Sequence, residues 1–357
     1  MTPTPPTIDW SDRFAGLLLG TAVGDALGLP AENLSAEQIR RRWQGRWKMR
    51  LIFGKGMVSD DTEHTLMVAQ ALLEHPDDVA AFQCALAWKF RWWFAALPGG
   101  VGLATARACL KLWLGFPPEK SAVTSAGSGP AMRSAIIGAR FAGAPARRRA
   151  FVLASSRLTH RGWQAETAAL AVAECAALAM ANRHRDAQQA LAILNELSRE
   201  SEWQDLISQI SSSLAVGASV SDFVGGLHLK RGLTGYALHV VPVAIYSWMR
   251  HPDDFRTALV AALDCGGDAD TVGAILGALS GAALGRTALP TEWVNEIWEW
   301  PGSVGYMENV ARRLADQETS GRPCGPVRYF WPGIILRNLF FLSVVLVHGL
   351  RRLLPPF

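Results

Sequence analysis

Glycine recurs at every fourth position in two helical segments that lie far apart in the chain. Residues 16–28 read GLLLGTAVGDALG, and residues 273–285 read GAILGALSGAALG. Residues four apart share one face of a helix, and a glycine inside a helix costs about 1 kcal/mol relative to alanine. A face without side chains lets a second backbone approach closely. We therefore expect these segments to form two helices that pack tightly on each other.

Most of the remaining chain also has helical periodicity. Segments such as TLMVAQALLEH and AETAALAVAECAALAMANRHR place apolar residues three and four apart and are rich in Ala and Leu, whereas the alternation typical of strands is scarce. The chain has 357 residues, 50% of them hydrophobic, which is enough for a large core. The pattern predicts one all-α domain over residues 10–318, preceded by a flexible leader over residues 1–9.

Cysteine content and charge distribution exclude several classes of protein. The five cysteines are scattered and lack CxxC spacing, which argues against a disulfide framework or a thiolate zinc site. The leader has neither the basic nor the apolar region of a signal peptide. The net charge is +4, and five arginines but no acidic residue follow position 318. We expect a cytoplasmic protein whose main domain has no face for nucleic acid.

The C-terminal tail, residues 329–357, differs from the domain before it. A stretch rich in Gly and Pro predicts a linker over residues 319–328, and the tail then reads YFWPGIILRNLFFLSVVLVHGLRRLLPPF. Its uninterrupted apolar run, residues 339–347, is too short to cross a bilayer. Arg337, His348 and Arg352 fall near one side of a helical wheel. The tail predicts either a helix at a membrane surface or one that packs on the domain or on a second copy.

Two aspartate-rich segments each begin a helical pattern: SDDT at residues 59–62 and DADT at residues 268–271. Asp60, with Glu63 three residues later, fits a capping box in which Asp60 is the N-cap, and a cap would be explanation enough if SDDT stood alone. Two such segments without cysteine or paired histidines indicate oxygen ligands for Mg²⁺, Mn²⁺ or Ca²⁺. We expect bound cations, because clustered carboxylates repel one another without them.

Six motifs, in this order, resemble the ADP-ribosylglycohydrolase family: GLLLGTAVGDALGLPAE, SDDT, SAGSGPAMR, TH, GYALHVVP and GGDADTVGAILGALSGAALG. The resemblance spans residues 11 to about 315. It implies an all-α orthogonal multi-helix bundle with a dinuclear metal site. It also implies a Mg²⁺-dependent hydrolase that releases ADP-ribose from a protein or small-molecule acceptor. Arginine N-linkage is the first expectation and serine O-linkage the second. The alternative is a non-catalytic ADP-ribose-binding or structural member of the fold.

The resemblance further implies which residues hold two Mg²⁺ ions, with Mn²⁺ as the other candidate metal. One ion would be held by Ser59, Asp60, Asp61 and Asp270. The other would be held by Glu32, Asp268, Asp270 and Thr271, so that Asp270 bridges the pair. Ser59 stands where the family commonly has threonine, and its hydroxyl can serve equally. The catalytic carboxylates near C1 of the distal ribose would be Asp61 and Glu32.

The residues expected to bind ADP-ribose come from three motifs. Glycines in SAGSGPAMR let backbone N–H groups approach a diphosphate, although a lone GSG is most often a turn. The family usually has asparagine at Ser128, so this chain lacks an amide contact there. The histidine after Thr159 matches one that lines the family's ADP-ribose groove. The complete expected set is Gly127, Ser128, Gly129, Met132, His160 and Tyr236.

Overall fold

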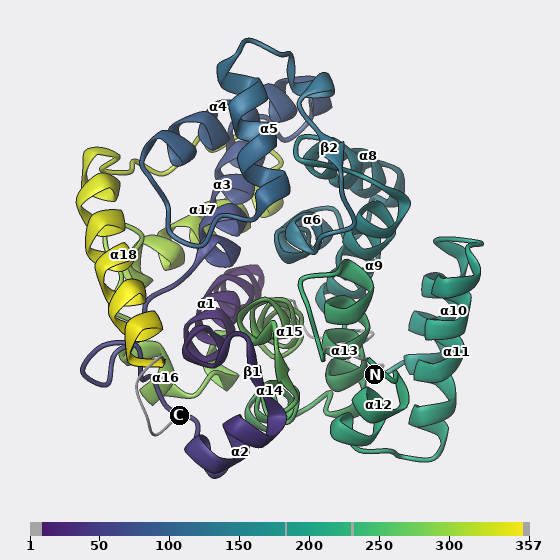
Figure 1. The fold of residues 1–357 in the computed structure, drawn as a ribbon. Coiled ribbons are helices and arrows are strands. Elements are labelled where there is room, and N and C mark those ends of the chain that lie inside the picture. Colours follow the sequence, from purple (N-terminus) through teal and green to yellow (C-terminus); the bar gives the residue numbers. More distant parts are fainter. Residues whose placement is uncertain (1–8, 183, 230–231, 353–357) are drawn as a thin grey trace, which may run out of the picture.

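A computed structural model describes residues 9–182, 184–229 and 232–352, and these residues are mainly helical (Figure 1). The prediction of an all-α orthogonal bundle is confirmed. The predicted leader lies outside the described residues except for Asp9, whose carboxylate caps α1 (Trp10–Gly28) by accepting the N–H of Asp12.

Helices α1 and α15 (Ala269–Leu284) lie side by side at the centre of the molecule (Figure 1). Their glycines meet backbone to backbone. A Cβ added to Gly24 would lie 1.9 Å from the carbonyl oxygen of Gly273, and one added to Gly277 would lie 2.0 Å from that of Gly20. Both distances are far below van der Waals contact, so these positions exclude every side chain. The predicted close packing of the two glycine faces is confirmed.

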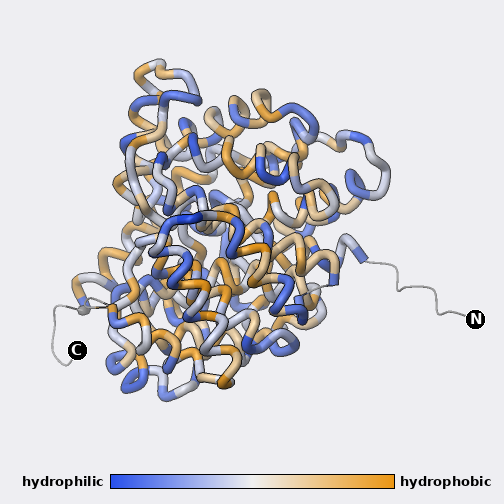
Figure 2. Tube along the Cα trace, turned by 90° about the vertical axis from the view of Figure 1, so that its right-hand side faces the viewer, coloured by the Kyte–Doolittle hydropathy of each residue, from blue (hydrophilic) through white to orange (hydrophobic). Residues whose placement is uncertain are grey.

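A layer of helices packs directly against this central pair. These are α3 (Asp60–Glu74), α7 (Ala135–Arg140), α9 (Trp163–Met180), α13 (Ala237–Arg250), α14 (Phe255–Leu263) and α17 (Val304–Ser320). The other helices lie mostly outside it: α2 (Ala36–Trp43), α4 (Val79–Ala95), α5 (Leu103–Trp113), α6 (Gly129–Met132), α8 (Pro145–Ser156), α10 (Ala187–Glu196), α11 (Ser201–Ala215), α12 (Val220–Gly226), α16 (Thr291–Asn295) and α18 (Pro332–Arg352). One continuous apolar core joins the layers, and hydrophilic stretches lie mostly at the outer turns (Figure 2).

Two short sheets join segments that are distant in sequence. Strand β1 (Leu34–Ser35) runs antiparallel to β4 (Gly266–Gly267), and β2 (Val123–Thr124) runs parallel to β3 (His160–Arg161). Single turns of 3₁₀ helix add η1 (Leu29–Ala31), η2 (Pro118–Lys120) and η3 (Arg286–Ala288). The first sheet places the residues before β1 beside DADT, and the second places SAGSGPAMR beside the TH motif.

The tail forms helix α18, which packs on the body along one face. Residues 321–331 between α17 and α18 carry no regular helix or strand. The face toward the body is buried at Ile334, Arg337, Asn338 and Phe341. Arg337 is therefore not on a lipid-facing side: it is paired with carboxylates of the body, because these satisfy a charge that burial would otherwise leave unpaired.

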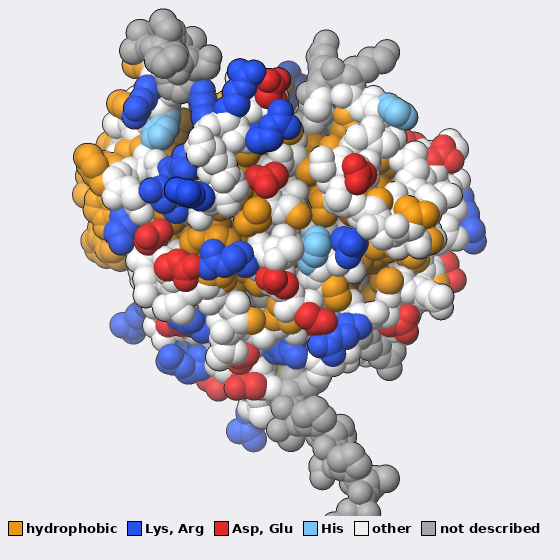
Figure 3. Space-filling model, turned by 90° about the horizontal axis from the view of Figure 1, so that it is seen from below, with side chains coloured by type: hydrophobic (Ala, Val, Ile, Leu, Met, Phe, Trp, Pro, Cys, Tyr) orange, Lys and Arg blue, Asp and Glu red, His pale blue; other side chains and the backbone are white. Residues whose placement is uncertain are grey.

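The outer face of α18 is apolar and exposed. Leu336, Leu346 and Leu350 are 66%, 57% and 63% exposed. Seen from below, an apolar patch lies at the left edge of the molecule, the side on which α18 runs, while Lys and Arg lie among Asp and Glu elsewhere on this face (Figure 3). By length and composition, two described helices could cross a bilayer, Trp10–Ala31 and Pro332–Arg351; 94% and 28% of their apolar windows are buried. The first is the core helix.

Candidate active site

A cavity of about 350 Å³ lies where the first turns of α3 and α15 meet. It gathers every site residue predicted from the sequence except Tyr236. The predicted residues in its wall are Glu32, Ser59, Asp60, Asp61, Gly127, Ser128, Gly129, Met132, His160, Asp268, Asp270 and Thr271. Segments that lie more than two hundred residues apart in the sequence thus converge on one site.

The SDDT turn positions the first group of oxygens. Ser59, not Asp60, is the N-cap of α3: its hydroxyl accepts the N–H of Asp61 at 3.3 Å and donates to Asp61 Oδ2 at 3.1 Å. The predicted capping box is wrong, because Glu63 accepts hydrogen bonds from Trp93 and Arg337 instead of reaching back to the cap. Asp60 is therefore the first residue of the helix, on the cavity wall.

Asp25 holds this turn in place, a role that the sequence did not reveal. It lies fully buried on α1, one residue after Gly24. Its carboxylate accepts the N–H of Ser59 at 2.9 Å and both the N–H and the hydroxyl of Thr62, at 3.2 and 2.5 Å. Burial raises the pKa of Asp25 to about 7, although these hydrogen bonds oppose the shift. The glycine-faced helix α1 is thereby tied to the turn that carries Asp60 and Asp61.

The DADT turn supplies the second group of oxygens. Gly266 and Gly267 precede it with φ of +72° and +78°, and a Cβ on either would lie within 2.5 Å of a backbone oxygen. Only glycine suits both positions. The turn then enters α15 with Asp268 as N-cap. The hydroxyl of Thr271 donates to Asp61 Oδ2 at 3.3 Å, which joins the two turns directly.

Glu32 reaches the cavity from the segment just before β1. The N–H of Asn33 donates to the carbonyl of Gly267 at 2.8 Å, and its side-chain amide donates to Glu32 Oε1 at 3.0 Å. Glu32 is half-buried, in contrast to the buried Asp61 and Asp270. The site therefore combines two buried carboxylates, Asp61 and Asp270, with three that are half-buried, Glu32, Asp60 and Asp268.

The electrostatics of the cavity favour a cation. Burial, followed by neighbouring carboxylates, raises the pKa of Asp60, Asp61 and Asp270 well above the usual range. Asp61 Oδ1 and Asp270 Oδ1 are buried without a hydrogen-bond partner. No three His, Cys, Asp or Glu side chains among the described residues already surround one point as metal ligands would. Two observations fit a divalent cation: the two unpartnered oxygens and the repulsion between the carboxylates. A bound cation would give the oxygens a partner and reduce the repulsion.

The glycine loop of SAGSGPAMR packs on His160. A Cβ on Gly127 or Gly129 would lie 3.0 Å from the imidazole ring, so glycine lets the loop settle directly on the histidine. The ring Nδ1 lies 2.8 Å from the Thr159 hydroxyl. Burial, then the charge of Arg133, lowers the pKa of His160 to about 3. His160 is thus a neutral wall of the cavity.

Arg133 supports the loop from behind and was missed in the sequence. Its guanidinium is fully buried, donates to the carbonyl of Gly129 at 2.8 Å, and also bonds Ser155 and Thr159. Its position at the end of SAGSGPAMR was the available signal, but a buried arginine without a carboxylate is not readable from a motif. It fixes the loop and the histidine motif relative to each other.

Tyr236 does not line the cavity, and its predicted contact with ADP-ribose stays a prediction. Its hydroxyl donates to Glu202 at 2.8 Å and its ring lies against His239. Its backbone pairs with Gly127. Tyr236 therefore shapes the glycine loop through the main chain, while its side chain is held elsewhere by Glu202.

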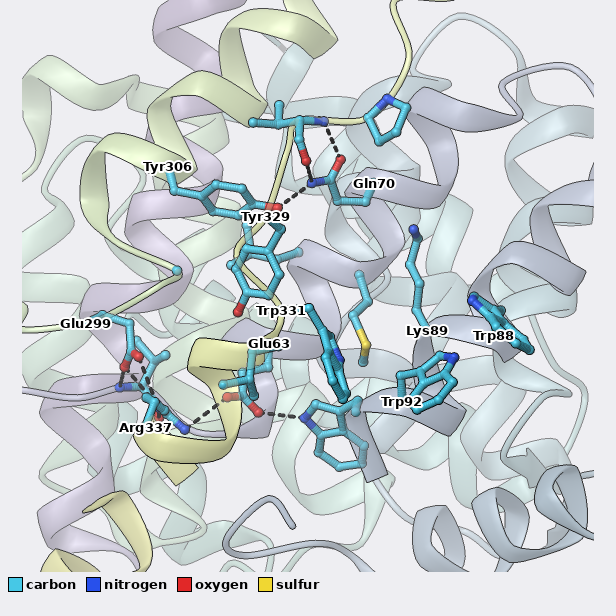
Figure 4. A pocket seen from close by; sticks show the side chains of 18 of the residues that line it. Glu63, Gln70, Trp88, Lys89, Trp92, Glu299, Tyr306, Tyr329, Trp331 and Arg337 are labelled. Carbon is cyan, nitrogen blue, oxygen red and sulfur yellow. Dashed lines mark hydrogen bonds and ion pairs between the residues drawn. The ribbon is translucent and has the colours of Figure 1, made fainter. Parts of the chain in front are cut away.

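A second, more apolar cavity of about 480 Å³ lies on another side of α3 (Figure 4). Aromatic side chains form much of its wall: Trp88, Trp92, Tyr306, Tyr329 and Trp331. Its charged groups are already paired, Arg337 with Glu63 and Glu299, and Lys89 with Glu74. It offers no cluster of reactive oxygens, so the smaller cavity is the candidate active site.

An all-helical bundle with an acidic cavity beside a glycine loop is the architecture expected of the ADP-ribosylglycohydrolases. The model of that family matches residues 6–323. The chain therefore belongs to the ADP-ribosylglycohydrolase family, whose members hydrolyse glycosidic bonds.

Two named relatives and one solved structure show how far the similarity extends. The ADP-ribosyl-dinitrogen reductase glycohydrolase of Rhodospirillum rubrum is 26% identical over 80% of this chain and 90% of its own length. The ADP-ribosylarginine hydrolase of Pseudomonas putida is 26% identical over 86% of this chain and 78% of its own. A structure described as an ADP-ribosylglycohydrolase-related protein complex superposes with a TM-score of 0.65 at 25% identity, covering 87% of this chain and 99% of that one.

Proposed function

We propose that this chain is a Mg²⁺-dependent hydrolase that removes ADP-ribose from an acceptor by cleaving the glycosidic bond at C1 of the distal ribose. The observation that carries the proposal is the meeting of SDDT and DADT in one cavity, with unpartnered buried oxygens on Asp61 and Asp270. The glycine loop in the same cavity supports a phosphate-bearing substrate, because its backbone is accessible at close range. The names of both relatives support ADP-ribose as the released group.

Two ions are proposed for this site, Mg²⁺ first and Mn²⁺ second. The residues that would hold them are Glu32, Ser59, Asp60, Asp61, Asp268, Asp270 and Thr271. When bound, such ions orient a substrate and polarise its oxygens, here the vicinal hydroxyls of the ribose. Asp270 would contact both ions, so its carboxylate is the least replaceable ligand of the set.

The two proposed catalytic carboxylates have different surroundings and therefore different tasks. Asp61 is 2% exposed and is held by the Ser59 and Thr271 hydroxyls. A fixed carboxylate beside C1 stabilises the positive charge of an oxocarbenium-like transition state. Glu32 is half-buried and anchored by Asn33, so part of its carboxylate reaches water, which suits proton transfer between the leaving group and water.

The acceptor is proposed to be an arginine side chain, with serine as the second choice. The name of the Pseudomonas putida relative supports arginine. The test is release of free ADP-ribose from mono-ADP-ribosylated arginine and serine peptides, with Mg²⁺ and with EDTA. The expected result is Mg²⁺-dependent release from the arginine peptide.

Matched variants separate catalysis from binding. Asp270→Asn should abolish release and weaken metal binding, whereas Asp205→Asn, exposed on α11, should behave as wild type. Near-native turnover of Asp270→Asn in Mg²⁺ would refute the two-metal site. Calorimetric binding of ADP-ribose without release from either peptide would instead favour the non-catalytic member of the fold.

The exposed face of α18 supports a second proposal, contact with a membrane surface from the cytoplasm. Leu336, Leu346 and Leu350 project outward, and Arg351 lies exposed at the same end of the helix, a composition suited to an interfacial helix. The five unpaired cysteines support the cytoplasmic location. Co-sedimentation with anionic vesicles tests the contact. Leu346→Asp should abolish binding, and equal binding by this variant would refute the proposal.

A further inference from the structure

Part of the catalytic cavity is built by α18, a helix outside the region that the family model matches. The matched region ends at residue 323, and α18 begins at Pro332. Yet Phe341 and Val345 line the cavity together with Asp60, Asp61 and Glu32. This wall of the cavity therefore comes from outside the matched region.

Phe341 is seated on the segments that carry the carboxylates. It is 2% exposed and packs in a small apolar cluster with Leu51 and Met57, to which Leu29 and Val345 add. Leu29 lies three residues before Glu32, and Met57 two residues before Ser59. On another side, Gly99 approaches so closely that a Cβ there would lie 3.0 Å from the Phe341 ring. The wall thus stands at the carboxylate end of the cavity, facing the loop of residues 97–102 that precedes α5.

A buried arginine fixes this wall in register with the SDDT turn. Arg337, one helical turn before Phe341, donates to Glu299 at 2.8 Å and to Glu63 at 2.9 Å (Figure 4). It also donates to the carbonyl of Val58 at 2.5 Å, immediately before Ser59. Asn338 donates to the carbonyl of Ala96 at 2.9 Å, which joins α18 to the residue just before the loop of residues 97–102. The wall cannot shift without disturbing these contacts.

We propose that Phe341 and Val345 form the acceptor side of the catalytic cavity and select acceptors by size, a proposal that rests on the proposed function. The reacting C1 would lie at the carboxylates, so the acceptor, which departs when its bond to C1 is broken, would extend toward the residues that bound that end. There, an aromatic ring and a valine face a glycine-containing loop. The space between them suits the aliphatic stem of one arginine side chain, either free or on an extended peptide. A folded protein that carries the arginine would collide with the α18 wall.

The test compares two substrates with the full chain. These are free ADP-ribosylarginine and a folded protein that is mono-ADP-ribosylated on arginine. Wild type should prefer the free substrate. Phe341→Ala should raise kcat/KM for the protein substrate about tenfold, the scale at which pocket shape discriminates, and change that for the free substrate by less than about threefold. Val345→Ala should act in the same direction but less strongly.

The matched control is Val347→Ala, two residues after Val345 but 62% exposed; it should leave the ratio of the two rates unchanged. Equal changes on both substrates, or none, with Phe341→Ala would overturn the inference while leaving the proposed function intact. Release from neither substrate by wild type would overturn both. If Phe341→Ala loses its folded circular dichroism, Phe341→Leu combined with Val345→Ala gives the same comparison with the apolar seat kept.

Discussion

The packing of α1 on α15 and the packing of α18 on the body differ in what makes the contact. In the first, glycines bring two backbones together, and a Cβ would meet a carbonyl oxygen at about 2 Å all along the face. In the second, side chains make the contact, chiefly Arg337 with two carboxylates and Phe341 in an apolar pocket. A backbone contact has no side chain that can adjust, whereas a side-chain contact concentrates its energy in few residues.

Gly24→Ala should have the largest effect, because neither backbone can yield to a Cβ placed 1.9 Å from Gly273 O. We expect a loss above about 4 kcal/mol in the free energy of unfolding, the range of severe core disruption. Urea denaturation followed by circular dichroism measures it. Gly225→Ala, in α12 with no atom within 4 Å of the added Cβ, should gain up to about 1 kcal/mol. An unchanged urea midpoint for Gly24→Ala would show that the helices can separate freely.

Arg337→Met should come next, because it leaves Glu63 and Glu299 buried without their partner. Removing one member of a buried ion pair costs about 3–5 kcal/mol, and urea denaturation should show a loss on this scale. Limited proteolysis should also cut the 321–331 segment faster as α18 loosens. Adding Glu299→Gln should recover part of the loss, and exposed Arg351→Met should change nothing. A loss below about 1 kcal/mol would mean that apolar contacts alone hold α18.

Asp25→Asn tests the link between the glycine contact and the site. The new amide group would oppose the donors of Ser59 and Thr62, so we expect a loss of about 2 kcal/mol, as for charge-assisted hydrogen bonds. Mg²⁺ affinity, measured by calorimetry, should fall as the SDDT turn shifts. Thr62→Ser, which keeps the hydroxyl, is the control. Wild-type stability together with wild-type Mg²⁺ affinity would show that Asp25 does not position the turn.

His160→Gln tests a contact intermediate between these two kinds, because here the glycines of a loop pack on a histidine side chain. The pKa of His160 is lowered to about 3 in the folded protein, against about 6.5 in an unfolded chain. The unfolded state binds more protons between these values, so the stability is complete above about pH 6.5 and falls as the pH drops. Between about pH 6.5 and pH 5, the variant should lose about 2 kcal/mol less than wild type.

Urea midpoints at several pH values measure this difference, and His228→Gln, which alters an exposed histidine, should track wild type. Parallel curves for wild type and His160→Gln would mean that the imidazole is not buried in its neutral form.

The same contrast explains what the sequence could predict. The glycine period, SDDT and DADT are local patterns, so the central helix pair and the two aspartate-rich turns of the cavity follow from them. Glu32, the glycine loop and His160 were placed by the family resemblance, and the rest of the cavity wall was not predicted. The sequence left the tail helix either at a membrane surface or docked, because Glu63, the partner of Arg337, lies 274 residues away, beyond any local pattern. Tyr236 was placed in the cavity by its motif, but a hydrogen bond to Glu202 holds its ring elsewhere.

Asp25 and Phe341 were missed for a related reason. An aspartate in a glycine-rich helix has no distinctive spacing, and its role comes from Ser59 and Thr62 of another helix. Phe341 is one apolar residue in an apolar run, and only the docking of α18 turns it toward the site. Contacts made by side chains between distant segments were the part that periodicity could not supply.

The order of the two central helices in the chain delays their packing during synthesis. Helix α1 is synthesised before its glycine-faced partner, which begins at Ala269. At about 5–20 residues per second, synthesis of the intervening chain takes roughly 10–50 s. Throughout that interval the cell holds an unpartnered segment, Trp10–Ala31, that is long and apolar enough to enter a membrane. During this interval α1 cannot bury its glycine face against α15, so slowed translation between the two helices should lower the yield of active protein.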